Sequence, residues 1–267
     1  MNRDLDNKNR VLVGLMMIFA LLIFGTWAAW EEKDASDFWT KYVAKPVEQN
    51  VAKLEQDEEP ELALDPNKPM IALTFDDGPS KYTDEILETL KLYDVKATFF
   101  LLGSRIDSYP DTIRKMEDIG CEIASHTYHH HDLTKLTPEE VGGEVEWTNQ
   151  HLTNVLGHGT ELVRPPYGAT TSEIENNMQY PLIMWSVDTT DWQSKDASAV
   201  ANHVLSVAKD GDIVLMHDIY VSTIEAVKIM IPILQERGYQ IVTVSEMAEL
   251  RGVTFEDGKK YFDFHKQ

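Results

Sequence analysis

Two adjacent carboxylates, Asp76 and Asp77, follow the apolar run 70–73, and a turn-forming Gly-Pro pair comes directly after them. Because neighbouring side chains of a strand point to opposite sides, one carboxylate at a strand end can face a metal ion while the other faces a substrate. The alternative is a strand that ends in an acidic turn, since Asp, Gly and Pro are common turn residues. This segment alone does not decide between the two interpretations.

Histidines gather in the segment 125–133, at positions 126, 129, 130 and 131. If the segment is helical, His126 and His130 lie at i and i+4 on one face, where two imidazoles can converge on one ion. A carboxylate would complete an Asp-His-His set that leaves coordination positions open, as catalytic metal sites do. We predict one divalent metal ion, Zn²⁺ first, with Co²⁺, Ni²⁺ or Mn²⁺ as alternatives. A solvated His-rich turn is the competing interpretation.

Three further motifs follow along the chain: RPPYG at 164–168, DTTDW at 188–192 and LMHD at 215–218. Each is weak alone, but the five motifs from Thr74 to Asp218 stand in a particular order. In that order the chain resembles the polysaccharide deacetylases, carbohydrate esterase family 4, which share the NodB homology domain. The resemblance covers residues 66–250 and implies an α/β fold, a distorted (β/α) barrel of about seven strands.

The resemblance implies a role for each of the acidic, basic and imidazole groups of the first motifs. Asp76 corresponds to the general base that activates the attacking water, and Arg164 orients this base by ion pairing. Asp77, His126 and His130 correspond to the metal ligands. The segment departs from the family pattern after His126, where two extra imidazoles stand at 129 and 131.

The remaining family roles fall on the later motifs. His217 corresponds to the general acid that protonates the leaving amine, with Asp191 as its carboxylate partner. Tyr167 supplies a backbone N–H for the oxyanion, because the two prolines before it have none. Trp192 would form part of the active-site wall, and Leu215 would line the pocket for the acetyl methyl group.

Two questions about metal ligation concern the histidine segment and the single cysteine. His131 could ligate in place of His130, although the HTxxH spacing favours His126 with His130. Cys121 stands where the family frequently has a histidine, but its apolar neighbours predict a buried strand residue rather than a ligand. One cysteine also excludes an intramolecular disulfide.

The chemistry is coherent for amide hydrolysis. That reaction needs a strong nucleophile, stabilisation of the oxyanion and a proton for the poor amine leaving group. The metal ion, Asp76 and His217 would supply these functions. Asp191 would raise the pKa of His217, because an opposite charge favours the charged imidazolium.

The N-terminal part of the chain predicts a membrane anchor. Val11 to Trp30 contains no charged residue and is long enough to span a bilayer core of roughly 30 Å. Basic residues precede this stretch and acidic residues follow it, so the positive-inside rule places the tail 1–10 in the cytoplasm. A cleavable signal peptide is the alternative. A lipoprotein anchor is excluded, since no cysteine lies nearby.

The rest of the chain divides into a stalk or linker at 31–65, a catalytic domain at 66–250 and a C-terminal extension at 251–267. Short apolar runs alternate with amphipathic stretches, as in β/α units. The expected helices are 83–93, 110–119, 138–155 and 224–235, and the expected strands begin at 70 and span 97–102, 121–124, 181–187, 212–216 and 239–244. Each chemical motif then lies at a strand end or in the loop after it, where parallel α/β enzymes place their sites.

Net charge and motif content limit the possible partners. A formal charge of -21 disfavours binding to nucleic acid. The sequence has no Gly-rich phosphate-binding loop before a helix, which argues against a nucleotide cofactor. We therefore expect a single-pass cell-membrane protein with an extracellular, metal-dependent N-deacetylase domain. Its expected substrate is N-acetylglucosamine in a cell-wall glycan, peptidoglycan first. The alternatives are chitin or chitooligosaccharide, exopolysaccharide and acetyl-xylan, or an inactive carbohydrate-binding protein on the same fold.

Overall fold

A parallel sheet organises the part of the chain that this computed structural model describes, which is Lys41 and residues 64–266. Its strand order is β3-β2-β1-β6-β5, and β7 pairs with the first half of β1. The strands are β1 (Met70–Asp76), β2 (Thr98–Leu101), β3 (Glu122–Ser125), β5 (Val187–Asp188), β6 (Asp212–His217) and β7 (Gln240–Val242). A separate parallel pair consists of β4 (Leu182–Ile183) and β8 (Lys260–Tyr261).

The parallel α/β fold is confirmed, whereas closure of the sheet into a barrel is not. Within residues 64–266, β3 is linked to the β4–β8 pair only through single-residue bridges of Val163 to Ser125 and to Leu182. The predicted strand 181–187 is also wrong, because it is divided into β4 and β5, which pair in different sheets. Between them, the Met184 carbonyl accepts a hydrogen bond from a side chain rather than from a strand partner.

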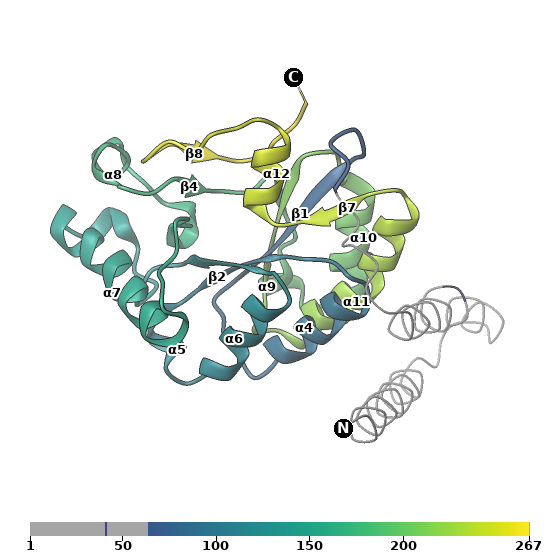
Figure 1. The fold of residues 1–267 in the computed structure, drawn as a ribbon, viewed down its shortest axis with the longest axis horizontal. Helices are drawn as coiled ribbons and strands as arrows, with labels where there is room; N and C mark the ends of the chain where they lie inside the picture. The colour runs from purple at the N-terminus through teal and green to yellow at the C-terminus, as the bar shows by residue number, and fades with distance from the viewer. Residues whose placement is uncertain (1–40, 42–63, 267) are drawn as a thin grey trace. The chain divides into compact units, whose positions relative to one another are not determined.

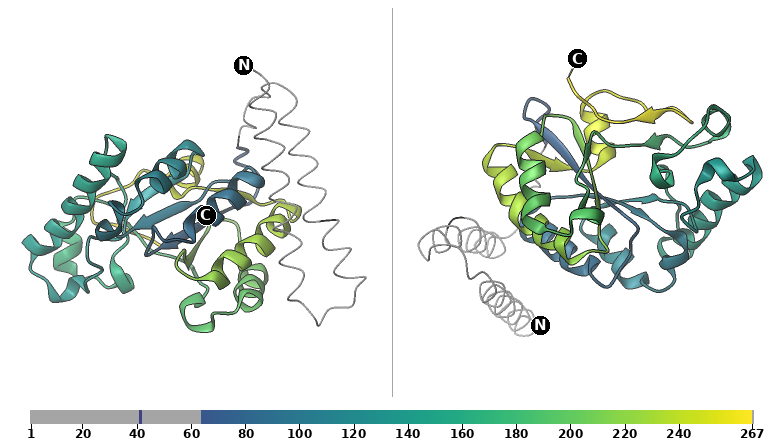
Figure 2. Two further views of the ribbon diagram at one scale, coloured as in Figure 1. Left: turned by 90° about the horizontal axis from the view of Figure 1, so that it is seen from below. Right: turned by 180° about the vertical axis from the view of Figure 1, so that it is seen from behind.

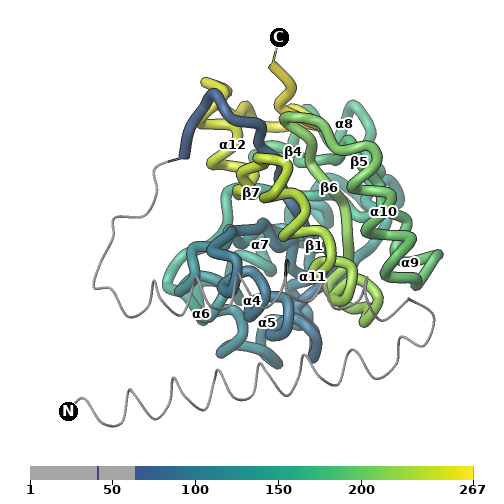
Figure 3. Tube along the Cα trace, turned by 90° about the vertical axis from the view of Figure 1, so that its right-hand side faces the viewer, coloured from purple at the N-terminus to yellow at the C-terminus, as the bar shows by residue number. Residues whose placement is uncertain are grey.

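The four expected helices are all present, with bounds close to the prediction. They are α4 (Thr83–Leu92), α6 (Pro110–Asp118), α7 (Pro138–Leu156) and α11 (Val221–Glu236). Within residues 64–266, five further α-helices were not expected: α5 (Gly103–Ile106), α8 (Ser172–Asn177), α9 (Asp191–Ser194), α10 (Ala197–Val207) and α12 (Val244–Leu250). Helices α10 and α11 lie side by side against the sheet (Figure 3).

The two faces of the sheet bury different cores because successive side chains of β1 alternate. Ile71 and Leu73 pack in the larger cluster, beneath α4, α6, α10 and α11. Met70 and Ala72 pack in a second cluster, with α12 and the β4–β8 pair on that side (Figures 1 and 2). The functional side chains lie at the end of this second face.

The segment 251–266 is built into the second face. Tyr261 and Phe264 are 7% and 4% exposed and belong to the second cluster. Phe264 N–H donates to the Gly211 carbonyl at 2.8 Å, directly before β6. The expected C-terminal extension is therefore continuous with the core of the domain.

Membrane anchoring concerns residues that the structure leaves undescribed. The expected tail 1–10, anchor 11–30 and nearly all of the stalk 31–65 lie outside the described residues. Among the helices that are described, none has the length and apolar character needed to cross a bilayer.

Candidate active site

The register of β1 and β6 places Asp76 directly opposite His217. Thr74 lies opposite Leu215, two residues earlier on both strands. Because residues two apart share a face of a strand, all four side chains lie on one face, at the carboxyl end of the sheet. The two groups expected to act as base and acid are thus neighbours, although 141 positions separate them in sequence.

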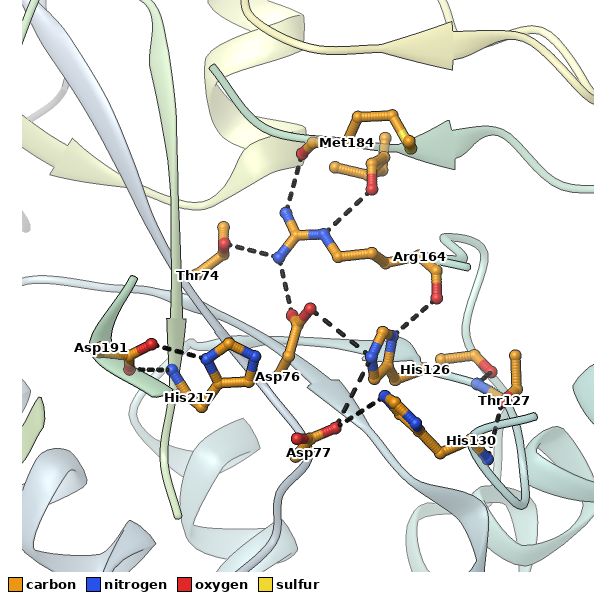
Figure 4. Close-up of polar contacts among 12 residues, drawn as sticks. Thr74, Asp76, Asp77, His126, Thr127, His130, Arg164, Met184, Asp191 and His217 are labelled. Carbon is orange, nitrogen blue, oxygen red and sulfur yellow. Dashed lines mark hydrogen bonds and ion pairs between the residues drawn. The ribbon is translucent and has the colours of Figure 1, made fainter. Parts of the chain in front are cut away.

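Arg164 holds one oxygen of Asp76 from inside the protein. Its side chain is fully buried, and Nη1 donates to Asp76 Oδ1 at 2.7 Å and to Thr74 Oγ1 at 2.8 Å. Nε and Nη2 donate to the carbonyls of Ile183 and Met184, both at 3.0 Å (Figure 4). The guanidinium therefore fixes Asp76 Oδ1 and leaves Oδ2 directed toward the site.

His126 and His130 lie on a loop, so the helical segment on which their i, i+4 pairing was conditional is not present. His126 directly follows β3, and its N–H donates to the Leu101 carbonyl of the neighbouring strand at 2.8 Å. Thr127 and His130 have φ angles of 69° and 63°, which no α-helix accommodates. This left-handed backbone turns the loop back on itself and brings the rings of His126 and His130 to 5.0 Å.

Asp77, His126 and His130 converge on a position that suits a cation. Asp77 Oδ1 lies 3.3 Å from His130 Nε2 and 3.7 Å from His126 Nε2. This oxygen is buried and has no hydrogen-bond partner among the described residues. A carboxylate oxygen and two imidazole nitrogens form a donor set that Zn²⁺ and similar divalent ions prefer. The three residues therefore could hold a metal ion.

The hydrogen bonding of His126 and the pKa of His130 both suit coordination. His126 Nδ1 donates to the Arg164 carbonyl at 2.8 Å, because a carbonyl oxygen can only accept, and in the neutral ring Nε2 is then the unprotonated nitrogen on the side of Asp77. Burial lowers the pKa of His130, and a positive charge on His126 would lower it further, whereas Asp77 and Asp76 oppose the shift. Neutral imidazoles are the forms that bind metals.

Asp191 binds His217 through both its ring and its backbone. Asp191 Oδ1 accepts from His217 Nδ1, and Oδ2 accepts from His217 N–H, both at 2.8 Å. Burial alone would lower the pKa of His217, but the hydrogen bond and charge of Asp191, with Asp76 and Asp77 adding to them, raise it to about 9. His217 is therefore an imidazolium at neutral pH in the metal-free protein.

Of the residues expected to face the substrate, two are exposed and one is buried. Tyr167 and Trp192 are 69% and 50% exposed, which is unusual for large aromatic side chains. The ring of Tyr167 lies 4.7 Å from that of His130. Leu215 is buried on β6, on the same face as His217. All ten residues selected from the sequence thus lie at this edge of the sheet or directly beside it.

Positive φ angles cluster here among the described non-glycine residues. They include Asp77 (71°), Thr127, His130, Tyr167 (61°) and Thr190 (50°). Such backbone conformations cost free energy and persist where the surrounding structure holds them, often at functional sites. Their position in the loops around Asp77, His130, Arg164 and Asp191 agrees with a site that is positioned by the fold.

Two supporting residues escaped the sequence analysis. Thr223, on α11, donates to Asp191 Oδ2 at 2.6 Å, and no local motif marks it. Asp218 directly follows His217, and its buried carboxyl group accepts from Thr83 Oγ1. Burial raises the pKa of Asp218 to about 7, and a Cβ on Gly78 would collide with this carboxyl group. Asp218 therefore packs against the loop that follows Asp77, and its position in the LMHD motif was the available signal.

The extra histidines and the cysteine have separate environments. His129 and His131 form a group with Glu144, distinct from the group of Asp77. Glu144 on α7 is a third residue that the sequence analysis missed. Cys121 is buried as predicted, directly before β3 rather than within it, and burial raises its pKa to about 12.

A family model described as polysaccharide deacetylase matches residues 63–181. The chain is 40% identical over 205 residues to the peptidoglycan-N-acetylglucosamine deacetylase PgdA of Listeria monocytogenes, covering 76% of this chain and 43% of the relative. It is 39% identical over 192 residues to the peptidoglycan-N-acetylmuramic acid deacetylase PdaC of Bacillus subtilis, covering 72% and 41%. The chain thus spans about two fifths of the length of these two relatives.

Solved structures share the fold. The structure titled "T48 deacetylase with substrate" superposes with a TM-score of 0.72 and 40% identity, covering 74% of this chain and 100% of the other. A family 4 acetyl xylan esterase from Clostridium thermocellum, in complex with a cobalt ion, gives a TM-score of 0.69 and 33% identity, covering 73% and 98%.

Proposed function

Because the chain belongs to the polysaccharide deacetylase family, we propose that it is a metal-dependent hydrolase that removes N-acetyl groups from N-acetylglucosamine residues of peptidoglycan. One observation carries the reaction type. Asp76 and His217 lie opposite each other on neighbouring strands, and Arg164 and Asp191 bind them from behind. This arrangement supports a general base and a general acid that act on the same amide group.

Asp77, His126 and His130 would hold one divalent ion, Zn²⁺ first, with Co²⁺, Ni²⁺ or Mn²⁺ as alternatives. When bound, the ion supplies a Lewis acid that polarises the acetyl carbonyl and lowers the pKa of water. The unpartnered Asp77 Oδ1 supports this assignment.

Asp76 acts as the general base in this proposal. Its Oδ2 accepts a proton as water attacks the acetyl carbon, while Arg164 keeps Oδ1 in place. The Tyr167 N–H would donate to the oxyanion, and Leu215 would contact the acetyl methyl group. Trp192, half exposed beside Asp191, would form part of the wall against the sugar.

His217 completes the reaction as the general acid. Its Nδ1 is bound by Asp191, and the opposite edge of the ring faces Asp76 (Figure 4). The imidazolium gives its proton to the sugar nitrogen as the C–N bond breaks. The products are acetate and a free amino sugar, and an amide needs this proton because an amine is a poor leaving group.

Acetate release by the full chain tests the function. The substrates are peptidoglycan, N-acetylglucosamine oligomers and acetyl-xylan, each with and without a chelator. We expect metal-dependent release from peptidoglycan, and Asp76→Asn should retain the metal but lose about 10²- to 10⁴-fold in rate. Preference for acetyl-xylan or chitooligosaccharide would reassign the substrate. No release from any substrate would favour the inactive carbohydrate-binding alternative.

The names of the relatives support the cell wall as the location of the substrate. PgdA and PdaC are both named for peptidoglycan, one for N-acetylglucosamine and the other for N-acetylmuramic acid. Separate fragments that end in each sugar would distinguish the two specificities. An acidic protein of net charge -21 also accommodates a cationic amino-sugar product.

The uncharged stretch 11–30 would anchor the protein in the cell membrane, with the catalytic domain outside the cell. This location would place the domain beside the wall. Fractionation of cells and protease treatment of intact protoplasts test it. Release of the domain into the medium would favour a cleaved signal peptide, and protection from protease would contradict the orientation.

A further inference from the structure

His129 and His131 project from the same loop as His130 but associate with a different carboxylate. His129 Nδ1 lies 2.7 Å from Glu144 Oε1, and His131 Nδ1 lies 3.5 Å from the same oxygen. Their rings are stacked, with centroids 5.1 Å apart and planes 17° apart. One ligand atom from each of the three residues lies within 4.8 Å of the other two.

We propose that His129, His131 and Glu144 form a second binding site for a divalent transition-metal ion of the zinc type, separate from the site of Asp77. Zinc binds imidazole nitrogen and carboxylate oxygen at about 2.0–2.2 Å in a tetrahedral arrangement, so its ligand atoms lie about 3.4 Å apart. The two Nδ1–Oε1 separations, 2.7 and 3.5 Å, lie on either side of that spacing, and rotation of the two histidine side chains would bring their nitrogens together. Water would occupy the fourth position.

Glu144 is oriented for this role by the fold. The residue is 3% exposed, and its Oε2 accepts the N–H groups of Tyr128 at 3.0 Å and His129 at 2.8 Å. Two backbone donors fix the carboxylate, and Oε1 is left for the imidazoles. A buried carboxylate held on a helix is a preorganised ligand, because little conformational entropy is lost in orienting it when the ion binds.

Because its two imidazoles are exposed, the second site is accessible to ions from solvent and should bind zinc more weakly than the first. The side chains of His129 and His131 are 44% and 55% exposed, so an ion can enter directly from solvent. Both must be ordered on binding, which costs side-chain entropy. The ligands of the first site are more buried, so the second ion should bind at higher free zinc concentration.

Zinc stoichiometry tests the proposal independently of activity. The metal-stripped full chain is dialysed against a series of Zn²⁺ concentrations, and protein and metal are measured by elemental analysis. We expect about two equivalents at saturation for the wild type and about one for His129→Ala/His131→Ala. Asp77→Ala should also retain about one equivalent, now at the second site.

His158→Ala is the matched control. His158 is also exposed and contacts a carboxylate, Glu117, at the same 2.7 Å, but no second imidazole joins this pair. This variant should keep about two equivalents. Because the histidine substitutions lie at the surface, circular dichroism should confirm an intact fold. A wild type that saturates at about one equivalent, or a double variant that keeps two, would overturn the second site.

Discussion

Arg164 is a cation removed entirely from solvent, and the residues around it account for its position. Four acceptors surround the guanidinium, and its Cζ lies 3.9 Å above the ring of Phe100. A buried charge is tolerated only when it is paired and hydrogen-bonded. The pair with Asp76 therefore serves stability as well as orientation of the proposed base.

The first prediction concerns this pair. Arg164→Met removes the cation and leaves Asp76 and two carbonyls without donors, so the free energy of unfolding should fall by about 3–5 kcal/mol. Urea unfolding of the metal-free protein measures the change. The double variant Asp76→Asn/Arg164→Met should lose less than the sum of the single variants, because it leaves no unpaired charge. Strict additivity would contradict an energetic link between them.

The second prediction concerns His217 and pH. If the imidazolium is the acid, kcat/KM should fall as pH rises through the pKa of His217, which Asp191 raises to about 9 in the metal-free protein. Asp191→Asn removes the charge that favours the imidazolium and should move this alkaline limb to lower pH. Hydrolysis of an acetyl ester depends less on protonation of the leaving group, so His217→Ala should lower kcat/KM less for the ester than for the amide. Equal losses on both substrates would remove the acid role.

The pH dependence of folding stability tests the raised pKa of His217 without measuring turnover. A folded-state pKa above the ordinary 6.5 means that the native protein holds the proton more tightly than the unfolded chain. The stability that the protonated His217 adds to the folded protein is fully present below about pH 6.5 and is lost as pH rises toward 9. Metal-free wild type should show this loss in urea unfolding, and Asp191→Asn should show less of it.

At the level of elements, α7 carries Glu144 and begins at a capping box. Thr137 Oγ1 accepts from the Glu140 N–H at 3.3 Å, and the Glu140 side chain accepts from the Thr137 N–H at 2.8 Å. These bonds satisfy two donors that the first helical turn would otherwise leave free. Thr137 lies about two helical turns before Glu144 and contacts neither it nor the histidine loop, so helix stability and the loop can be tested separately.

The third prediction is that Thr137→Ala lowers the free energy of unfolding by about 1 kcal/mol, within the usual range for a lost N-cap acceptor. Zinc stoichiometry and kcat should remain at wild-type values, because the residues of the site keep their contacts. Thr137→Ser retains the hydroxyl acceptor and should be nearly neutral. If Thr137→Ser were as destabilising as Thr137→Ala, the cap would not be the cause.

At the level of the whole molecule, the last residues close the second core. Phe264 is 4% exposed, whereas Phe262, two residues earlier, is 47% exposed. The two therefore form a matched pair in one short segment. Their difference measures whether the segment 251–266 stabilises the domain or merely follows it.

The fourth prediction uses this pair. Phe264→Ala should lower the free energy of unfolding by about 3–5 kcal/mol, because it removes a buried ring and leaves a cavity. Phe262→Ala should change it by no more than about 0.5 kcal/mol. Thermal and urea unfolding of both variants provide the comparison. Similar values for the two would show that the C-terminal segment does not contribute to the core.

The sequence determined the groups that share the site because order and residue type are local properties. The adjacent aspartates, the HTxxH spacing and the RPPYG, DTTDW and LMHD motifs, through their resemblance to a known family, selected ten residues, and the structure places all of them at one edge of the sheet or directly beside it. Periodicity likewise identified α4, α6, α7 and α11, since an amphipathic pattern can be recognised from neighbouring residues alone, although it missed α10.

Tertiary structure decided the features that depend on contacts between distant segments. His126 and His130 converge through left-handed loop residues, and the predicted strand 181–187 is divided into β4 and β5, between which the Met184 carbonyl accepts from Arg164. Thr223 on α11 reaches Asp191, and Glu144 on α7 reaches His129 outside the active site, and neither helix carries a sequence motif for the contact. Residue types set which hydrogen bonds are possible, but only the packing of remote elements determines which donor meets which acceptor.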